Sequence, residues 1–203
     1  MSRGCRLLAL LALAFGLALA GPAGAESVRL VFVGDVMLDD GPGRLISRGG
    51  DPLAAFTAQL RDADYTIGNL ECPIATQGQA LASKIYSFRA DPRVAPLLKG
   101  RFDALAVANN HSGDYGQQAF LETLDHLSGQ GIAAFGGGRN LEEAHQPLWI
   151  TRGGLRIAVL AYSEFKPRSF EAGAEWPGIA WSEDSQVVAD IRAARAAGAD
   201  LVI

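Results

Sequence analysis

The fold of this chain is decided by the stretch ALAVANNH at residues 104–111. Its first five residues form an unbroken apolar run, which is typical of a buried β-strand. The run ends in Asn109, Asn110 and His111, so two neutral amides and an imidazole stand where the strand leaves its sheet. Ligands bind at that edge of open α/β sheets. The stretch therefore predicts a core strand with a polar site beside it.

Two apolar runs upstream end in the same way. Residues 31–35 read VFVGD and finish in Asp35, and residues 65–71 read YTIGNLE and include Asn69 and Glu71. Asn69 and Glu71 are two positions apart, so along an extended backbone their side chains point to the same side of the strand. Three strands that end in polar side chains predict one shared site at one edge of a sheet.

Helical and extended patterns alternate along the rest of the chain. Helical spacing or capping signals predict helices, and β-branched or apolar runs predict strands. This alternation indicates an α/β fold with a largely parallel core. The hairpin signal Arg152-Gly153-Gly154 predicts some antiparallel pairing as well, so mixed sheets are expected. The predicted strands are 28–33, 65–70, 104–108, 132–135, 147–151 and 155–161; the predicted helices are 52–63, 91–98, 116–127, 140–145 and 182–197.

Residues 1–25 have the pattern of a secretory signal peptide. Arg3 and Arg6 precede an apolar stretch at 7–20, and Ala23-Gly24-Ala25 fits the small-residue cleavage rule. An uncleaved N-terminal anchor is the alternative. Residues 26–203 are then expected to form an exported domain, in the periplasm, outside the cell or in the cell envelope.

Composition limits the function classes. The 203 residues are 49% hydrophobic, which suffices for one domain with a core, and the formal net charge is −4. Removal of the leader arginines makes the charge more negative, and no basic run remains to support nucleic-acid binding. Cys72 is the only cysteine after the leader, so an internal disulfide is excluded from the mature chain.

The chain ends inside an apolar run at residues 201–203, directly after a predicted helix and Gly198. Such an end favours a fragment or a truncated reading frame. A natural C-terminal edge strand is the alternative.

The polar strand ends are candidates for metal and catalytic chemistry. Asp35 is suited to Mg²⁺, Mn²⁺ or Zn²⁺, although a turn-forming role is favoured for this residue taken alone. Glu71 is either a metal ligand or a loop residue. The Asn110 amide and the His111 imidazole can reach one ligand at a strand end. Neutral imidazole binds metals and imidazolium protonates leaving groups, although a lone histidine is more often structural.

Other chemical residues give weaker signals. Cys72 is expected to be a buried thiol rather than a nucleophile. The glycines at 136–138 favour a tight strand-to-helix connection over a phosphate cradle. His126 is expected on the surface of a helix. His145 is expected near the end of a helix, where a positive charge is favourable.

Four motifs together resemble the bacterial CapA family, whose members are linked to poly-γ-glutamate capsule synthesis. The resemblance runs from about residue 28 to the end of the chain. The motifs are Gly34-Asp35-Val36-Met37, Asn69-Leu70-Glu71, Ala108-Asn109-Asn110-His111 with Asp114-Tyr115-Gly116, and Gly136-Gly137-Gly138-Arg139-Asn140.

That family looks like a branch of the calcineurin-like metallophosphoesterases. The resemblance implies a layered α/β/β/α sandwich and a site for divalent metal ions, two in number, at the strand ends. It implies metal binding by Asp35, Glu71 and Asn110 and a catalytic role for His111 near the leaving group. Two metals would activate a water and clamp phosphoryl oxygens. The substrate-binding candidates are Asn69 and Asn109.

Two departures from the phosphoesterase pattern stand out. Met37 occupies the position of a metal-binding histidine, and a thioether is a poor ligand for hard metals. Family members also continue, beyond the last residue here, with a His-Trp-Gly-x-Glu-Tyr-like stretch. Both departures remove donors from the expected site.

The sequence thus predicts an exported CapA-like envelope protein that acts in poly-γ-glutamate or capsule biosynthesis through a metallophosphoesterase-like site. One alternative is a secreted metal-dependent phosphoesterase acting on small phosphate esters. Another is a non-catalytic module that binds an anionic envelope polymer. The expected partners are an anionic polymer or a phosphate-containing small molecule, and membrane proteins of capsule synthesis, but no nucleic acid.

Overall fold

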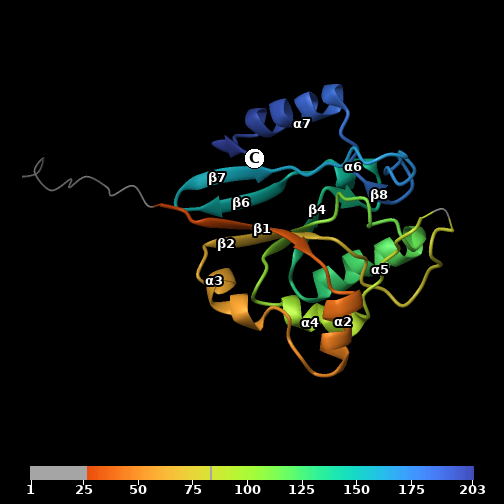
Figure 1. Cartoon of the computed structure of the whole chain (residues 1–203). Coiled ribbons are helices and arrows are strands. Elements are labelled where there is room, and N and C mark those ends of the chain that lie inside the picture. The colour runs from red at the N-terminus through yellow and green to blue at the C-terminus, as the bar shows by residue number, and fades with distance from the viewer. Residues whose placement is uncertain (1–26, 83) are drawn as a thin grey trace, which may run out of the picture.

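The computed structural model describes residues 27–82 and 84–203, which fold into stacked layers (Figure 1). The expected signal peptide lies outside the described residues. A four-stranded sheet has helices on one face and a three-stranded sheet on the other, and a further helix covers the outer face of the second sheet. The predicted α/β class and the α/β/β/α layering are confirmed.

The first sheet is entirely parallel, with strands in chain order. It consists of β1 (Leu30–Val36), β2 (Tyr65–Leu70), β3 (Ala104–Ala106) and β4 (Ala133–Phe135). All four strands therefore end at the same edge, which is the edge where the sequence places its polar residues.

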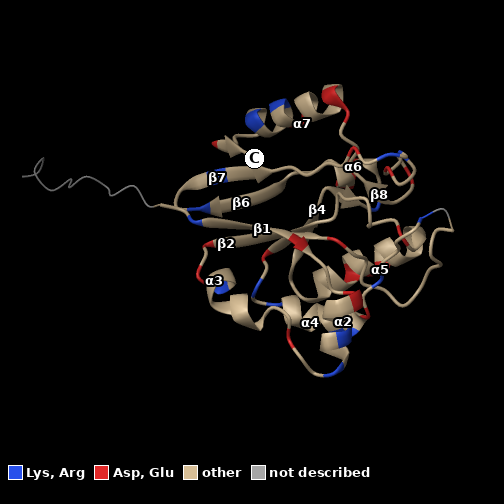
Figure 2. Ribbon diagram, viewed as in Figure 1, with Lys and Arg blue, Asp and Glu red and all other residues tan. Residues whose placement is uncertain are grey.

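Strand β3 is buried on both faces, as its apolar run predicts. Ala104 and Ala106 contact the cluster between the two sheets, whereas Leu105 and Val107 pack toward the helices. This alternation follows from the two-residue period of extended chain. Figure 2 shows that the charged residues lie mainly on helices and loops, whereas the strands of the two stacked sheets are largely uncharged.

The helix layer beside the first sheet is formed by four α-helices. The longest has Phe120, Leu124 and Leu127 on its inner face, as predicted from their helical spacing. These helices are α2 (Asp40–Ser47), α3 (Thr57–Arg61), α4 (Ala95–Leu98) and α5 (Gly116–Gly129), with 3-10 turns η1 (Ala54–Phe56) and η2 (Pro92–Val94) before α3 and α4.

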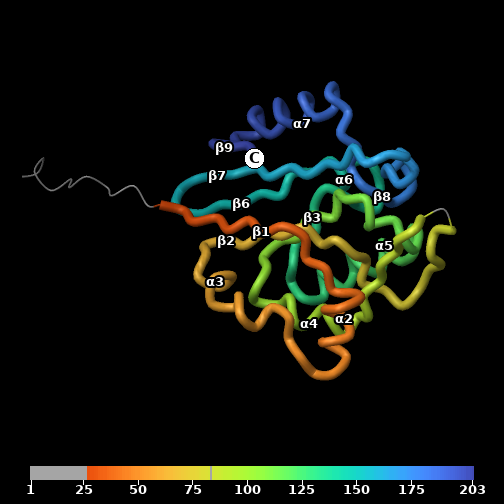
Figure 3. Tube along the Cα trace, in the orientation of Figure 1, coloured from red at the N-terminus to blue at the C-terminus, as the bar shows by residue number. Residues whose placement is uncertain are grey.

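The predicted hairpin belongs to a second sheet rather than to the first. Strands β6 (Leu148–Arg152) and β7 (Leu155–Val159) pair antiparallel, and β9 (Leu201–Val202) pairs parallel with β7. Helix α7 (Asp184–Ala196) covers them through small residues, and Figure 3 shows β9 next to β7 beneath it. A short pair, β5 (Gly137–Gly138) with β8 (Gly178–Ile179), stands apart from both sheets.

Helix starts follow the capping signals in the sequence. Asp91 accepts a hydrogen bond from the Arg93 amide ahead of η2, and Asn140 accepts one from the Glu143 amide at the start of α6 (Leu141–Ala144). Helix α2 was not predicted, because Gly41, Pro42 and Gly43 give its first turn a poor helical propensity.

Among the helices that the structure describes, none has both the length and the apolar character for a membrane crossing.

We expect Gly178→Ala to lower the free energy of unfolding by about 2 kcal/mol, because overpacking a close contact is destabilising. A Cβ at Gly178 would lie 2.5 Å from the Phe170 carbonyl oxygen and 2.6 Å from the Ala172 nitrogen. Gly129→Ala is the control, since a Cβ there meets nothing within 4 Å. Urea unfolding measures both variants, and equal stabilities would contradict the expectation.

Candidate active site

The three polar strand ends meet in one hydrogen-bonded cluster. The Asn69 amide nitrogen donates to Asp35 Oδ1 at 2.8 Å and to Glu71 Oε2 at 2.6 Å. The Asn109 amide nitrogen donates to Asn69 Oδ1 at 2.9 Å. The structure therefore brings β1, β2 and the turn after β3 together, as the shared sheet edge predicts.

A bulge in β1 aims Asp35 into this cluster. Phe32 is opposite Ile67, but Asp35 is opposite Asn69, so β1 contains one extra residue in the interval. Bulges redirect side chains at the rims of sheets and next to functional sites. Without the extra residue, Asp35 would be paired one position further along β2. The sequence analysis did not anticipate this bulge.

Asn109 joins the β3 turn to the end of β2. Its Oδ1 accepts from the backbone amides of His111 and Ser112, both at 3.0 Å, and its Nδ2 also donates to the Leu70 carbonyl at 2.8 Å. The side chain is buried, and its amide is engaged within the protein. This geometry gives Asn109 a positioning role, and substrate contact by Asn69 or Asn109 stays a prediction.

His111 is oriented by a buried carboxylate. Its Nδ1 lies 2.8 Å from Asp114 Oδ2, and its Nε2 lies 3.7 Å from Glu71 Oε1. The ring also packs against Phe88 with 4.8 Å between centroids. A neutral His111 that donates from Nδ1 to Asp114 presents the Nε2 lone pair toward Glu71. This arrangement suits an acid, a base or a metal ligand.

Asp114 binds more than the imidazole. Its carboxylate forms an ion pair with Lys84 and accepts from the Phe88 amide at 2.8 Å. Lys84 Nζ also donates to the Asn110 carbonyl oxygen at 2.7 Å. The sequence analysis gave Lys84 no role and quoted Asp114 only within a motif. That motif was the sequence signal for Asp114, and it does not include Lys84.

The site raises the pKa of the Glu71 carboxyl above its ordinary value. Burial is the main cause, and the negative charge of Asp35 adds to it, while the Asn69 amide opposes both. A carboxyl with a raised pKa next to a histidine is a typical arrangement at functional sites. Glu71 and His111 therefore form a pair suited to proton transfer.

The donor types in the cluster fit a divalent cation, since carboxylate oxygens and imidazole nitrogen bind Mg²⁺, Mn²⁺ and Zn²⁺. Among residues 27–82 and 84–203, however, no three His, Cys, Asp or Glu side chains are gathered to hold one. The Asn69 amide nitrogen lies between Asp35 and Glu71, where a shared cation would compete with it. Met37 packs against the core on the helix side of the sheet.

The remaining candidates lie elsewhere. Burial raises the pKa of the Cys72 thiol to about 11, so the predicted buried thiol is confirmed. His126 lies near Glu122 on α5. His145 directly follows α6, and its Nδ1 lies 2.7 Å from Asp190 of α7. A Cβ at Gly138 would lie 2.4 Å from the Glu143 Cβ, which confirms the tight connection predicted for residues 136–138.

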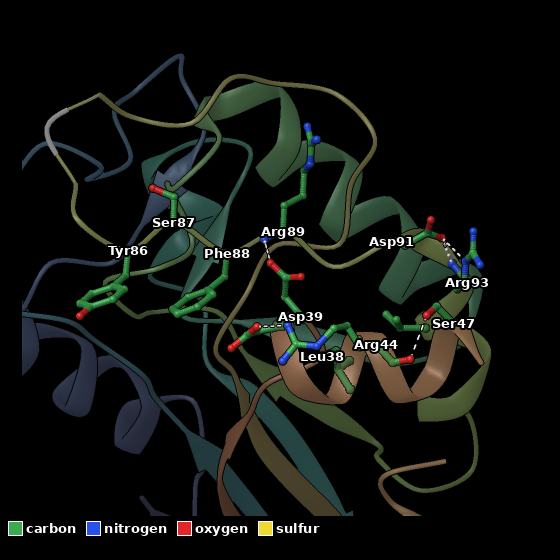
Figure 4. Close-up of a pocket in the computed structure, with 13 residues that line it drawn as sticks. Leu38, Asp39, Arg44, Ser47, Tyr86, Ser87, Phe88, Arg89, Asp91 and Arg93 are labelled. Carbon is green, nitrogen blue, oxygen red and sulfur yellow. Dashed lines mark hydrogen bonds and ion pairs between the residues drawn. The ribbon is translucent and has the colours of Figure 1, made fainter. Parts of the chain in front are cut away.

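A cavity of about 590 Å³ lies between α2 and the segment before η2 (Figure 4). Its charged side chains are engaged with protein partners: Arg44 with Asp40, and Arg93 with Asp91. Asp39 accepts from the Arg89 backbone amide at 2.8 Å. The cavity is therefore a weaker candidate for the active site than the cluster around His111.

We expect Asp114→Ala to lower the free energy of unfolding by about 3 kcal/mol, because it leaves Lys84 and the Phe88 amide without their buried partner. Asp125→Ala removes an exposed pair with Arg139 and should cost at most about 1 kcal/mol. Chemical denaturation of both variants measures the difference. Equal losses would show that the Asp114 contacts contribute little.

The raised pKa of Glu71 predicts that the Glu71→Gln variant gains stability relative to the wild type as the pH rises. Above the ordinary carboxyl pKa of 4.5, the folded protein binds a proton more tightly than the unfolded chain, so this group lowers wild-type stability as pH rises. The variant does not titrate there. Its stability relative to wild type should therefore increase from pH 4.5 upward and then level off.

The measurement is urea unfolding across this pH range with a chelator present. A stability difference independent of pH would contradict the expectation.

Comparison with known proteins identifies the family of this chain. The family model described as bacterial capsule synthesis protein PGA_cap matches residues 29–203. The chain is 29% identical over 157 residues to the PGA biosynthesis protein CapA of Bacillus subtilis (strain 168), covering 73% of this chain and 40% of that protein.

Other relatives have related names. The capsule biosynthesis protein CapA of Bacillus anthracis is 25% identical over 75% of this chain and 39% of its own length. A probable polyglutamine synthesis accessory protein of Mycobacterium tuberculosis is 32% identical over 57% of this chain and 32% of its own length. The chain thus spans two fifths or less of these relatives. With the family model covering nearly all described residues, this chain belongs to the PGA_cap family of bacterial capsule synthesis proteins, as its CapA-like motifs predicted.

Proposed function

We propose that this protein acts in poly-γ-glutamate capsule biosynthesis as an exported protein of the cell envelope. Family membership and the names of the two Bacillus relatives support the process. The leader-like pattern of residues 1–25 supports export. Within the chain, the observation that carries a chemical role is the orientation of His111 by buried Asp114, with Nε2 facing Glu71.

In this proposal, His111 transfers a proton at Nε2. Asp114 holds the ring in place through Nδ1 and stabilises the imidazolium that forms when Nε2 is protonated. Glu71, whose carboxyl has a raised pKa, has its Oε1 3.7 Å from His111 Nε2, and it can exchange a proton with a water or a leaving group held beside the two side chains. The chemistry is therefore that of a hydrolase or a group transferase.

We further propose that Asp35, Glu71 and Asn110 hold a divalent cation during the reaction. Bound there, a cation would polarise an oxygen of the substrate and favour attack by water. The carboxylates of Asp35 and Glu71 already share one amide donor, so they lie on the same side of the cluster. Asn110 lines a groove of about 460 Å³ that is also lined by His111 and so adjoins the cluster.

We expect His111→Ala to reduce surface poly-γ-glutamate of the native host by at least about tenfold, because general acid–base groups commonly contribute more than this. His126→Ala is the matched control, since that histidine lies on α5 near Glu122 and outside the cluster. Both alleles replace the chromosomal gene, and immunoblots establish equal protein levels. Polymer is then measured per cell.

The outcomes separate three functions. Normal polymer with His111→Ala would overturn the proposal. Hydrolysis of a simple phosphodiester by the purified protein, dependent on both His111 and added cation, would instead favour a secreted phosphoesterase. Polymer binding that persists with chelator and with His111→Ala would favour a non-catalytic binder.

A further inference from the structure

Lys84 reaches the site from the loop after β2, although the chemistry proposed for His111 gives it no part. The backbone amides of Leu81 and Phe88 both donate to Asp114, to its carbonyl oxygen at 3.0 Å and to its Oδ2 at 2.8 Å. Lys84 lies between these two anchors, and its side chain is 22% exposed. The loop therefore brings one ammonium group to a carboxylate that is fully buried.

The Lys84 ammonium contacts three groups of the turn after β3. It forms an ion pair with Asp114 Oδ1, donates to the Asn110 carbonyl oxygen at 2.7 Å, and lies 3.4 Å from His111 Nδ1. A compact ammonium with three donors suits such a set better than a planar guanidinium. The Asp114 carboxylate is divided as a result, because Oδ1 faces Lys84 while Oδ2 faces His111 Nδ1.

The distances favour a hydrogen on His111 Nδ1 that is donated to Asp114. Nδ1 lies 2.8 Å from Asp114 Oδ2 and 3.4 Å from Lys84 Nζ, and the nearer group is an anionic acceptor. A ring nitrogen that carries its own hydrogen does not accept one from Lys84. The neutral ring then has its lone pair on Nε2, as the proposed proton transfer requires.

The charge of Asp114 depends on Lys84. A buried carboxylate without a cationic partner loses its hydration, which favours its protonated form. Burial, the charge of Asp35 and the charge of Asp114 all raise the pKa of Glu71, so the surroundings are already acidic. In the part of the chain that the structure describes, Lys84 is the one lysine or arginine paired with Asp114. Without this ammonium, Asp114 should take up a proton.

We propose that Lys84 is a positioning residue that selects the tautomer of His111. A protonated Asp114 would donate its hydrogen to Nδ1, and the hydrogen of the neutral ring would then lie on Nε2. Such a ring presents a hydrogen instead of a lone pair toward Glu71 and accepts no proton there. The inference rests on the proposed function only in taking His111 as the acid–base residue.

The test is the tautomer of His111 in the full chain labelled with ¹⁵N-histidine, read from long-range ¹H–¹⁵N NMR correlations. Spectra are recorded at about pH 8.5, far above the ordinary histidine pKa of about 6.5. The chain has three histidines, so His111→Ala identifies the signal. The wild type should carry the hydrogen on Nδ1. Lys84→Met should move it to Nε2, since methionine has a similar length but no charge.

Two controls accompany this variant. Lys99→Met should leave the tautomer unchanged, because Lys99 is exposed at the end of α4 and outside the cluster. His145 is an internal reference, since its Nδ1 also faces a carboxylate, that of Asp190 at 2.7 Å. Its signal should be the same in every variant, which shows that the fold is intact.

Alkylation of a Lys84→Cys variant tests the charge itself. Reaction with 2-bromoethylamine gives a side chain of nearly lysine length that ends in an ammonium, and iodoacetamide gives a neutral amide. Cys72 is buried and burial raises its pKa to about 11, so this thiol is protected. The ammonium should restore the hydrogen on Nδ1, and the amide should not.

The same variants are compared in the native host. Lys84→Met should lower surface poly-γ-glutamate by at least about tenfold, because a wrongly protonated imidazole loses general-base catalysis. Lys99→Met should leave the amount of polymer unchanged.

Three results would overturn the inference. The first is a wild-type His111 with its hydrogen on Nε2, which is decisive even where a variant fails to fold. The second is a hydrogen that stays on Nδ1 in Lys84→Met while the His145 signal is unchanged. The third is normal polymer with Lys84→Met but not with His111→Ala. A tautomer that follows Lys84, together with normal polymer in His111→Ala, would support the role of Lys84 and reject the proposed function alone.

Discussion

The arrangement of the site depends on one buried carboxylate. Asp114 is fully buried, and it accepts from the Phe88 amide while it contacts the Lys84 ammonium and the His111 imidazole. A buried charge of this kind is tolerated only with several partners in place. Because these partners come from the loop after β2 and from the turn after β3, the carboxylate fixes one against the other. The ring of His111 and the mouth of the groove are positioned together as a result.

The parallel sheet provides the frame for that carboxylate, and this part of the molecule could be predicted from the sequence. The apolar run of β3 and its two-sided burial follow from composition, and the Asp91 and Asn140 caps follow from local hydrogen bonding. Local rules failed at α2, where Gly41 and Gly43 argue against a helix that packing nevertheless retains through Ile46. They also failed to assign the hairpin to its own sheet, because that choice depends on contacts distant in sequence.

The site was predictable in location but not in its internal contacts. Polar residues at the ends of parallel strands must share an edge, so the meeting of Asp35, Asn69 and Asn109 follows from the fold class. The β1 bulge depends on pairing with β2, and the Lys84–Asp114 pair joins residues 30 positions apart. No local pattern encodes either contact. The sequence therefore indicated which residue types gather, while the structure shows which of them are positioned by others.

The cluster also holds an electrostatic conflict that a purely structural role would not need. Glu71 is partly buried and close enough to Asp35 for that charge to raise its pKa, and the Asn69 amide is a neutral donor shared between the two. A neutral donor offsets less repulsion than a proton or a cation would. Local rules are commonly violated at functional sites, where the cost is balanced by stability elsewhere in the fold. The conflict would be relieved by a proton on Glu71 or by a cation in place of the amide, and both belong to the chemistry proposed for His111 and Glu71.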